Sequence, residues 1–196
     1  SVVIVDYLYN LIFLEGGVIT LKLKIVGSGG MSIIPSSFCK CKICEEARQK
    51  GGRYERLGPS LYIDDIKMLI DTPEDIAVAC NRQKISEVKH ISISHHDPDH
   101  VKGIRIVEKI GCDFITGENN PIGFYALPEV IEDINRTNLD CLKYYGDVIN
   151  CISINETSHV KINNFDIDLI NNNPDRNITF YVIKENEKKV IYACCN

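Results

Sequence analysis

The sequence lacks the features that would connect it to nucleic acid or to a membrane. It has no cluster of lysines and arginines, and its formal net charge is −5, so it offers a polyanion no broad electrostatic attraction. Its most apolar stretch, residues 1–17, has no basic segment, is interrupted by Asp6 and Glu15 and is too short to cross a bilayer. We therefore expect no membrane anchor and no nucleic-acid partner.

Internal repeats, low-complexity segments and an interdomain linker are also missing from the sequence. Of the 196 residues, 44% are hydrophobic and 25% are charged, which fits one globular domain with a substantial core and excludes a disordered or fibrous chain. We expect residues 18–196 to form this domain. Residues 1–17 are expected to be an N-terminal extension that adds a strand or a helix to it.

The pattern of the nine cysteines does not indicate a disulfide framework. The chain is longer than the small secreted domains that rely on disulfides, the number of cysteines is odd, and three of them stand in one tight run. Reduced thiols and metal ligation explain this usage better. We therefore expect a cytoplasmic protein.

The order of apolar and polar residues predicts strands interspersed with helices along the whole chain. Alternation indicates strands, and apolar residues three and four positions apart indicate helices. Expected strands lie within residues 18–30, 58–72, 87–95, 159–170, 177–190 and 190–196, and expected helices cover residues 73–84, 99–111 and 127–137. This order predicts a single mixed α/β domain.

Residues 95–100, HHDPDH, hold three of the five histidines beside two aspartates. They stand where a strand is expected to end and a helix to begin, which is a common place for ligand sites in α/β folds. Imidazole and carboxylate groups that converge in a tight turn can bind a metal ion. We predict four metal ligands here: His95, Asp97, Asp99 and His100.

These residues also have ordinary structural explanations, which stay open at this point. Asp99 could cap the following helix, and Asp97 with Pro98 could form a simple turn. His96 could point to solvent.

A second candidate metal site is the run of Cys39, Cys41 and Cys44. The C-x-C-x-x-C spacing allows three thiolates to reach one tetrahedral zinc, with a fourth ligand from elsewhere. Two alternatives remain. The three cysteines could be unrelated thiols, or they could join an iron–sulfur cluster with one more cysteine. That cysteine would come from Cys80, Cys112, Cys141 or Cys151.

The sequence resembles the metallo-β-lactamase superfamily. Its segment SHHDPDHVKG, residues 94–103, is similar to the His-x-His-x-Asp-His signature of these two-metal hydrolases. The segments LKIVGSGG, MLIDTPEDI and KKVIYACC resemble other strand ends of the family. The run PSSFCKCKICEEAR, residues 35–48, resembles the branch that contains phosphoribosyl cyclic phosphodiesterase and coenzyme PQQ biosynthesis protein B, in which such a run carries a structural zinc.

This resemblance implies an αββα sandwich of two mixed sheets flanked by helices, shortened on its C-terminal side. It implies a structural zinc on the cysteine run, and zinc, manganese or iron in the histidine–aspartate site. Asp97 stands at the position of the family's second histidine, and Cys195 stands at that of its bridging aspartate, where its thiolate would be a metal ligand. Asn172 or Asn173 occupies the place of a further histidine, and the family's last histidine has no counterpart.

Two functions follow from these observations. The first is a metal-dependent hydrolase of a phosphodiester or cyclic phosphate, with a divergent two-metal site and with Asp99 as the catalytic residue that orients the attacking water. Its partner would be a phosphate-containing small molecule, and the enzyme could be a homodimer. The second is a non-catalytic descendant that keeps the zinc site and the fold as a binding or assembly module. A role in metal storage or redox sensing rests on the number of cysteines alone.

Overall fold

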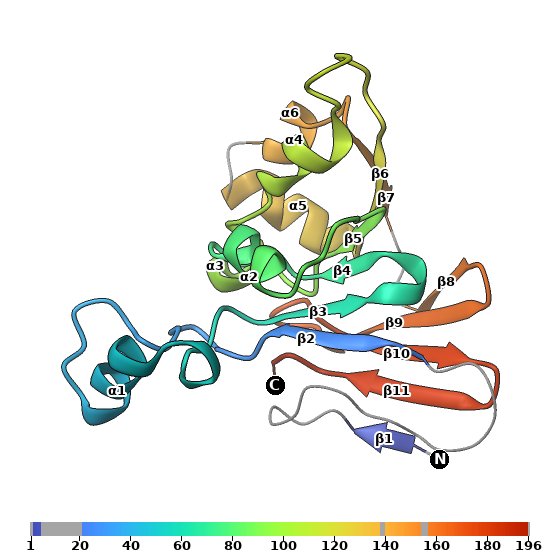
Figure 1. Cartoon of the computed structure of the whole chain (residues 1–196). Coiled ribbons are helices and arrows are strands. Elements are labelled where there is room, and N and C mark those ends of the chain that lie inside the picture. The colour runs from blue at the N-terminus through green and yellow to red at the C-terminus, as the bar shows by residue number, and fades with distance from the viewer. Residues whose placement is uncertain (1, 5–20, 138–139, 154–156, 196) are drawn as a thin grey trace.

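Two sheets make up the strand layers of the computed structural model (Figure 1). The structure describes residues 2–4, 21–137, 140–153 and 157–195. The six-stranded sheet has the order β2 (Leu23–Gly27), β3 (Ser60–Ile63), β4 (Met68–Ile70), β5 (His90–Ser92), β6 (Ile122–Ala126) and β7 (Ile149–Ser153). The five-stranded sheet has the order β1 (Val2–Ile4), β11 (Lys188–Tyr192), β10 (Ile178–Glu185), β9 (Phe165–Asn173) and β8 (Thr157–Ile162).

The strand directions bring several loops to one edge of the six-stranded sheet. Strands β2, β3 and β4 are antiparallel neighbours, whereas β4, β5, β6 and β7 run parallel to one another. Parallel neighbours need crossover connections, which the helices supply. The carboxyl ends of β4, β5 and β6 therefore lie together, and residues that follow these strands can meet. In the five-stranded sheet, β8 to β11 are antiparallel and β1 is parallel to β11.

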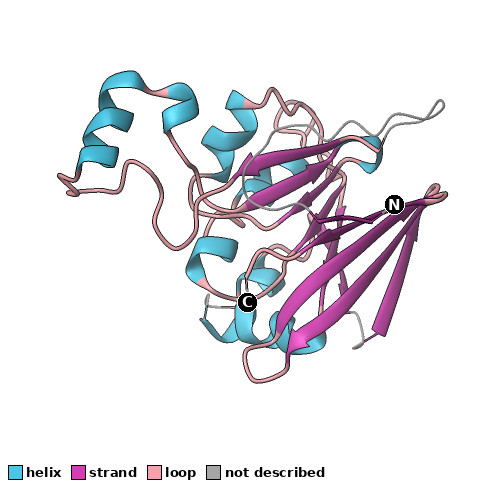
Figure 2. Ribbon diagram, turned by 90° about the horizontal axis from the view of Figure 1, so that it is seen from below, coloured by secondary structure: helices cyan, strands magenta, loops and turns pink. Residues whose placement is uncertain are grey.

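The helices gather on one side of the strands (Figure 2). Those that pack on the outer face of the six-stranded sheet are α2 (Ile76–Arg82), α3 (Pro98–Val101), α4 (Ile106–Gly111), α5 (Pro128–Thr137) and α6 (Cys141–Tyr144). Helix α1 (Lys42–Lys50) and the short η1 (Gly52–Tyr54) belong instead to residues 28–59, which we call the arm because they project from the body in Figure 1. A further short turn, η2 (Asp64–Ile66), joins β3 to β4.

Both faces of the six-stranded sheet are buried. Successive side chains of a strand point to opposite faces of the sheet, so each strand contributes residues to both layers. Tyr62, Leu69 and Ile91 pack against the helices. Leu61, which precedes Tyr62, and Ile70, which follows Leu69, point to the opposite face and pack against the five-stranded sheet. All five expose at most 2% of their surface, and burial of each such side chain contributes about 1.5–3 kcal/mol. These two apolar layers hold the strand ends in place.

The predicted mixed α/β sandwich of two sheets is confirmed. Among the described residues, helices cover the outer face of the six-stranded sheet and none covers that of the five-stranded sheet. The reason lies in the connections of the five-stranded sheet: β8, β9, β10 and β11 follow one another through turns of two to four residues, which leave no length for a helix between them.

The expected N-terminal extension contributes β1, which pairs with β11 through Val3 and Val190. Residues 5–17 of that extension lie outside the described residues, so the boundary at residue 18 stays a prediction. Among the helices that the structure describes, none is long and apolar enough to cross a membrane.

Candidate metal sites

Asp71 is the centre of the hydrogen bonds at the carboxyl ends of β4 and β5. It follows β4 directly, is fully buried and has φ of 65°, a left-handed conformation that residues other than glycine rarely adopt. Its amide donates to the Ser92 carbonyl over 2.8 Å, and its carboxylate accepts from the Ser94 amide over 2.7 Å and from the Ser94 hydroxyl over 2.8 Å. The two strand ends are thereby joined at Ser94, one residue before His95.

The helix expected over residues 99–111 is interrupted, and the interruption positions His100. The His100 carbonyl accepts a hydrogen bond from the Thr72 amide, and the Gly103 amide donates to the Thr72 carbonyl, each over 2.8 Å. A Cβ atom on Gly103 would lie 2.0 Å from the Pro73 carbonyl oxygen, so only glycine allows this approach. The chain therefore forms α3 and α4 instead of one helix, and His100 is fixed against the end of β4.

His95 and His100 are buried, with 1% and 0% exposed, and their ring centroids are 4.0 Å apart. His95 Nδ1 lies 2.9 Å from the Ser94 hydroxyl oxygen, whose own proton is donated to Asp71, so His95 Nδ1 must be the donor. His100 Nδ1 lies 2.9 Å from Asp71 Oδ2 and donates to that carboxylate. Each ring therefore has its Nε2 atom left for a ligand, which is the arrangement usual for metal-bound histidines.

The charge of Asp71 also controls the protonation of His100. Burial disfavours a charged imidazole, but the negative charge and the hydrogen bond of Asp71, together with Cys195, outweigh it and raise the pKa of His100 to about 10. Without a metal, the ring therefore carries a proton on Nε2. A metal ion would have to displace that proton.

The two predicted aspartates lie beside these Nε2 atoms. Asp97 Oδ2 is 3.4 Å from His95 Nε2, and Asp99 Oδ2 is 3.6 Å from His100 Nε2. Their side chains are 34% and 19% exposed, so the space between the four residues opens toward the surface. The structure thus brings the four predicted ligands together, and their binding of a metal stays a prediction.

The turn at Asp97 and Pro98 is present, since the Asp97 carbonyl accepts from the His100 amide over 2.9 Å, but the other two simpler explanations for this segment fit the structure poorly. Asp99 lies inside the first turn of α3 and not at its cap, and Asp97, which does precede the helix, makes no capping hydrogen bond. His96 does not point freely to solvent, because its side chain is only 28% exposed and its Nδ1 atom lies 3.4 Å from Asp133 Oδ2 on α5.

Cys195 completes the group, which we call the histidine cage: His95, Asp97, Asp99, His100 and Cys195. Its Sγ atom lies 3.4 Å from His100 Nε2. Close contacts with Cys194, His100 and His95 hold the pKa of the Cys195 thiol far below its usual range, and thiolate sulfur is a good metal ligand. The placement agrees with the predicted ligand role, which stays a prediction.

Cys194 was not expected at this site. With His95 and His100 it forms a buried trio whose ligand atoms lie within 4.8 Å of one another and could hold a metal. However, the Cys194 thiol donates to the Ser94 hydroxyl over 3.2 Å, on the Nδ1 side of both rings. Its contact with the Cys195 sulfur and its burial raise its pKa well above the usual value. We therefore regard Cys195, which faces His100 Nε2, as the better ligand.

Sequence reasoning also missed Arg176, which reaches the cage from the turn between β9 and β10. Its guanidinium donates to Asp97 Oδ2 over 2.8 Å. Asn172 and Asn173, which stand where the family has a histidine, lie at the end of β9, and the Asn173 carbonyl accepts from the Arg176 amide over 3.1 Å. The residue of this segment that contacts the cage is therefore Arg176, through Asp97.

The arm carries the second candidate site, the thiol cluster of Cys39, Cys41 and Cys44. The three sulfur atoms lie within 4.8 Å of one another, and the Ser36 amide donates to Cys44 Sγ over 3.3 Å. Hydrogen bonds from the Cys44 amide and from the two neighbouring thiols lower the pKa of Cys41 to about 7. Three convergent sulfurs, one of them readily deprotonated, fit a thiophilic ion such as zinc.

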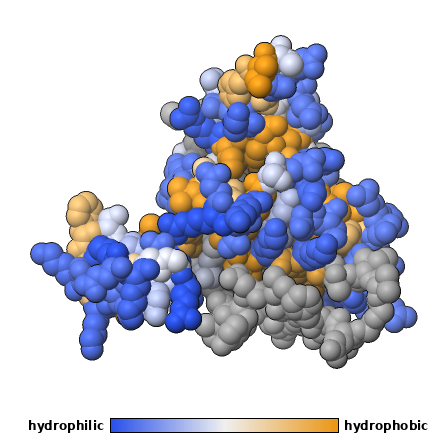
Figure 3. All heavy atoms as spheres, viewed as in Figure 1, coloured by the Kyte–Doolittle hydropathy of each residue, from blue (hydrophilic) through white to orange (hydrophobic). Residues whose placement is uncertain are grey.

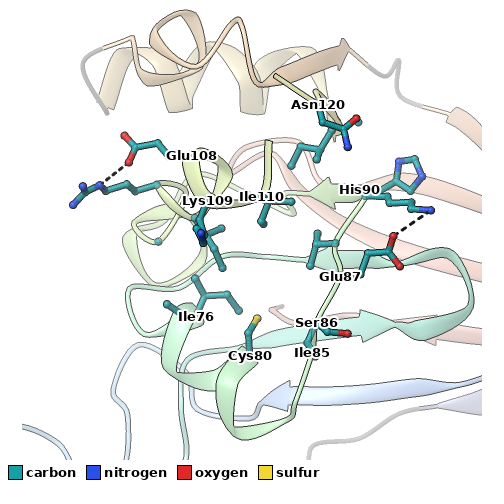
Figure 4. A pocket seen from close by; sticks show the side chains of 18 of the residues that line it. Ile76, Cys80, Ile85, Ser86, Glu87, His90, Glu108, Lys109, Ile110 and Asn120 are labelled. Atoms are coloured by element: carbon teal, nitrogen blue, oxygen red, sulfur yellow. Dashed lines mark hydrogen bonds and ion pairs between the residues drawn. The ribbon is translucent and has the colours of Figure 1, made fainter. Parts of the chain in front are cut away.

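A separate groove of about 1290 Å³ crosses the outer face of the six-stranded sheet. Ile76 and Cys80 of α2 line one side, Glu108 and Ile110 of α4 line the other, and His90 stands at one end (Figure 4). Apolar residues gather on this face of the body, whereas the arm is mainly hydrophilic (Figure 3). No residue of the histidine cage or of the thiol cluster lines the groove, so it is distinct from both sites.

Known proteins resemble this chain in structure far more than in sequence. No protein-family model and no curated protein matches the sequence. A diphosphatase of the PhnP family matches with a TM-score of 0.65 and 21% identity over 82% of this chain and 61% of its own. Zinc-bound PqqB from Methylobacterium extorquens matches with a TM-score of 0.71 and 17% identity over 87% of this chain and 64% of its own.

A third match is the metallo-β-lactamase fold protein YhfI from Bacillus subtilis, with a TM-score of 0.57 and 13% identity over 87% of this chain and 60% of its own. The chain thus spans less than two thirds of the length of each of these three proteins. At such identities the likeness establishes the fold alone. The chain therefore has the metallo-β-lactamase fold, in the form shared with the PhnP-family diphosphatase and PqqB.

Proposed function

We propose that this protein is a metal-dependent hydrolase whose substrate contains a phosphodiester or a cyclic phosphate. The observation that carries the proposal is the pair of buried imidazoles at the strand ends. His95 and His100 have Nδ1 bonded within the protein and Nε2 directed at the carboxylates of Asp97 and Asp99. Open sites of this composition suit metal-assisted hydrolysis, because an ion held there keeps room for water and substrate.

The cage residues divide the chemical work. When bound, the ion would make water more acidic and polarise the phosphoryl oxygen. Asp99 is the carboxylate best placed to accept a proton from the attacking water, because it is partly exposed and, unlike Asp97, is not paired with Arg176. Asp71 and Ser94 hold the two imidazoles in the tautomers that direct Nε2 at the ion.

Arg176 supports the choice of a phosphate-containing substrate. Its side chain is 54% exposed at the rim of the cage, where it pairs with Asp97. Guanidinium groups bind phosphate oxygens through paired hydrogen bonds, so a substrate phosphate could replace Asp97 as its partner. The name of one structural relative, a diphosphatase of the PhnP family, is a second reason to begin with phosphorus–oxygen bonds.

Hydrolysis of bis-p-nitrophenyl phosphate with added zinc or manganese tests this proposal. We expect turnover that depends on metal and that disappears in the double variant His95→Ala, Asp99→Ala. Cys151→Ala is the matched control, since this exposed cysteine on β7 belongs to neither site, and it should leave turnover unchanged. Turnover that persists in the double variant would place the reaction elsewhere, and no turnover by the metal-loaded wild type would refute the hydrolase.

One observation favours a second candidate, the non-catalytic zinc-binding module. Asp97 already pairs with Arg176, and Cys195 contacts His100 Nε2, so the cage has fewer free ligands than a two-metal hydrolase needs. Metal analysis separates the two candidates. Zinc in the thiol cluster combined with an empty cage would favour the module, whereas metal in both sites together with turnover would favour the hydrolase.

A further inference from the structure

We propose that Cys194 and Cys195 form a redox pair, and that a peroxide closes them into a disulfide that releases the metal ion from the histidine cage. The inference rests on the proposed function, because it assigns regulation to that same site. It makes the cage sensitive to oxidants through residues that the chain contributes directly after β11.

Cys195 is placed to be the thiol that reacts first with the peroxide. It is partly exposed, its sulfur lies 3.4 Å from His100 Nε2, and it directly follows Cys194 in the chain. Exposure to solvent is one of the conditions under which a peroxide oxidises a cysteine. The same sulfur is the candidate metal ligand, so its oxidation removes a ligand from the cage.

Cys194 has the position of the thiol that resolves the first oxidation product. It is 4% exposed and donates to the Ser94 hydroxyl over 3.2 Å, so it is shielded from solvent and held next to its neighbour. Ser94 also accepts from His95 Nδ1. A shift of Cys194 toward Cys195 therefore disturbs the hydrogen bonds that orient the imidazole as well.

The chemistry balances with hydrogen peroxide as the oxidant. The Cys195 thiolate attacks one peroxide oxygen, an S–O bond forms, the O–O bond breaks, and the departing hydroxide takes up a proton to give water. The Cys194 sulfur then attacks the sulfenic sulfur, an S–S bond forms, the S–O bond breaks, and a second water leaves with the Cys194 proton. Two thiols lose two electrons, and one peroxide becomes two waters.

Adjacency makes this disulfide easy to reverse. Neighbouring Cα atoms are about 3.8 Å apart across a trans peptide, whereas unstrained disulfides have Cα atoms about 4.4–6.8 Å apart. A bond between adjacent cysteines is therefore strained. Strained disulfides are reduced readily, as regulatory disulfides must be.

Mass spectrometry of the zinc-loaded protein after treatment with hydrogen peroxide tests the pair. Trypsin cleaves after Lys189, so one peptide that begins at Val190 contains both cysteines, whereas Lys40 and Lys42 separate the cysteines of the thiol cluster into different peptides. We expect the Val190 peptide to lose two hydrogens and to regain them with dithiothreitol. Disulfides of the thiol cluster would appear instead as cross-linked peptides.

Zinc released into a chromogenic chelator gives the second readout. We expect the wild type and the control Cys151→Ala to release more zinc than Cys194→Ser, which keeps a donor for Ser94 and removes only the resolving sulfur. In that variant Cys195 should gain oxygens instead of losing hydrogen. A wild type that gains the same oxygens, or a disulfide that forms without extra zinc release, would overturn the inference. Neither readout depends on hydrolysis, so the redox pair and the hydrolase can fail separately.

Discussion

In the arm, three cysteines within six residues bring their sulfurs together without help from the body, whereas the histidine cage takes its residues from strand ends far apart in the sequence. The thiol cluster lies in and before α1, on a projecting segment. The cage joins residues 95–100 to Cys195, with Asp71 and Arg176 as supports. We therefore expect the fold to tolerate loss of the thiol cluster, whereas the buried residues of the cage, His95 and His100, belong to the core.

This difference predicts opposite consequences for substitutions in the two sites, and the largest concerns Asp71. Asp71→Ala removes the partner of the buried His100 and three hydrogen bonds to Ser94 and His100. We expect the free energy of unfolding to fall by about 3–5 kcal/mol, because a buried charge loses its partner. Urea unfolding followed by circular dichroism measures it.

Asp97→Ala is the matched control for Asp71→Ala, because it removes a carboxylate of the same cage that is partly exposed. Exposed ion pairs contribute about 0–1 kcal/mol, so its unfolding curve should stay close to that of the wild type. Equal losses in the two variants would contradict the distinction between a supporting and a rim aspartate.

The second prediction tests whether the backbone around His100 belongs to the core. Gly103→Ala places a Cβ atom 2.0 Å from the Pro73 carbonyl oxygen. We expect it to lower the free energy of unfolding by about 1–3 kcal/mol, as overpacking does, and to reduce metal binding by the cage. Gly30→Ala is the control, since nothing lies within 4 Å of its added Cβ. If Gly103→Ala left the free energy of unfolding unchanged, the junction of α3 and α4 would be able to move away from the added Cβ atom.

The same contrast explains which parts of the molecule the sequence could predict. Strands β10 and β11 were expected because a polar turn separates two apolar runs, and β9 was expected within residues 159–170. Strand β6 was missed because all of its residues, Ile122–Ala126, are buried, and a continuously apolar strand has no period of two. The helix expected over residues 99–111 was wrong as a single helix, since bonds from Thr72 interrupt it. The sequence of residues 99–111 alone gives no sign of Thr72, so this interruption could not be predicted from it.

For the candidate sites, local spacing was enough to predict that the three thiols lie together and that His95 and His100 lie beside Asp97 and Asp99, while their binding of metal stays a prediction. Local spacing could not identify Asp71, Ser94, Cys194 or Arg176 as supports, because their roles depend on which strand ends meet. Asp71 did give one signal, as an acidic residue at the end of a buried run, MLID. A buried strand that ends in a carboxylate at the shared edge of a parallel sheet would have been reason to place it beside the histidines.

The third prediction isolates the arm. Cys41→Ser should lose about one zinc equivalent, because zinc needs thiolates at such a site, while the histidine cage keeps its metal. The free energy of unfolding of the body should change by less than about 0.5 kcal/mol, as for surface substitutions away from the core. Elemental analysis and urea unfolding check both parts. Unchanged zinc content would refute the structural zinc, and a large loss of stability would show that the arm supports the body.

The smallest expected effect on stability concerns His159. In contrast to the buried His100, it lies on the exposed face of the five-stranded sheet. Hydrogen bonds to Asp168, 2.8 Å from Nδ1, and to Asp166, 2.9 Å from Nε2, raise the pKa of His159 although partial burial opposes them. Lys184 pairs with Asp168 and Lys161 lies 3.8 Å from Asp166, so both carboxylates already have cations nearby. The contribution of His159 should therefore be small.

Its sign still follows from the direction of the shift. Because the folded protein binds this proton more tightly than the unfolded chain, His159 stabilises the fold fully below the unperturbed imidazole pKa of about 6.5. The stabilisation is lost as the pH rises through the higher pKa of the folded state. The unfolding free energies of wild type and His159→Gln should thus differ most in mild acid and converge above neutrality, in urea titrations at a series of pH values. A difference that grew with pH would mean that the two aspartates do not hold this proton.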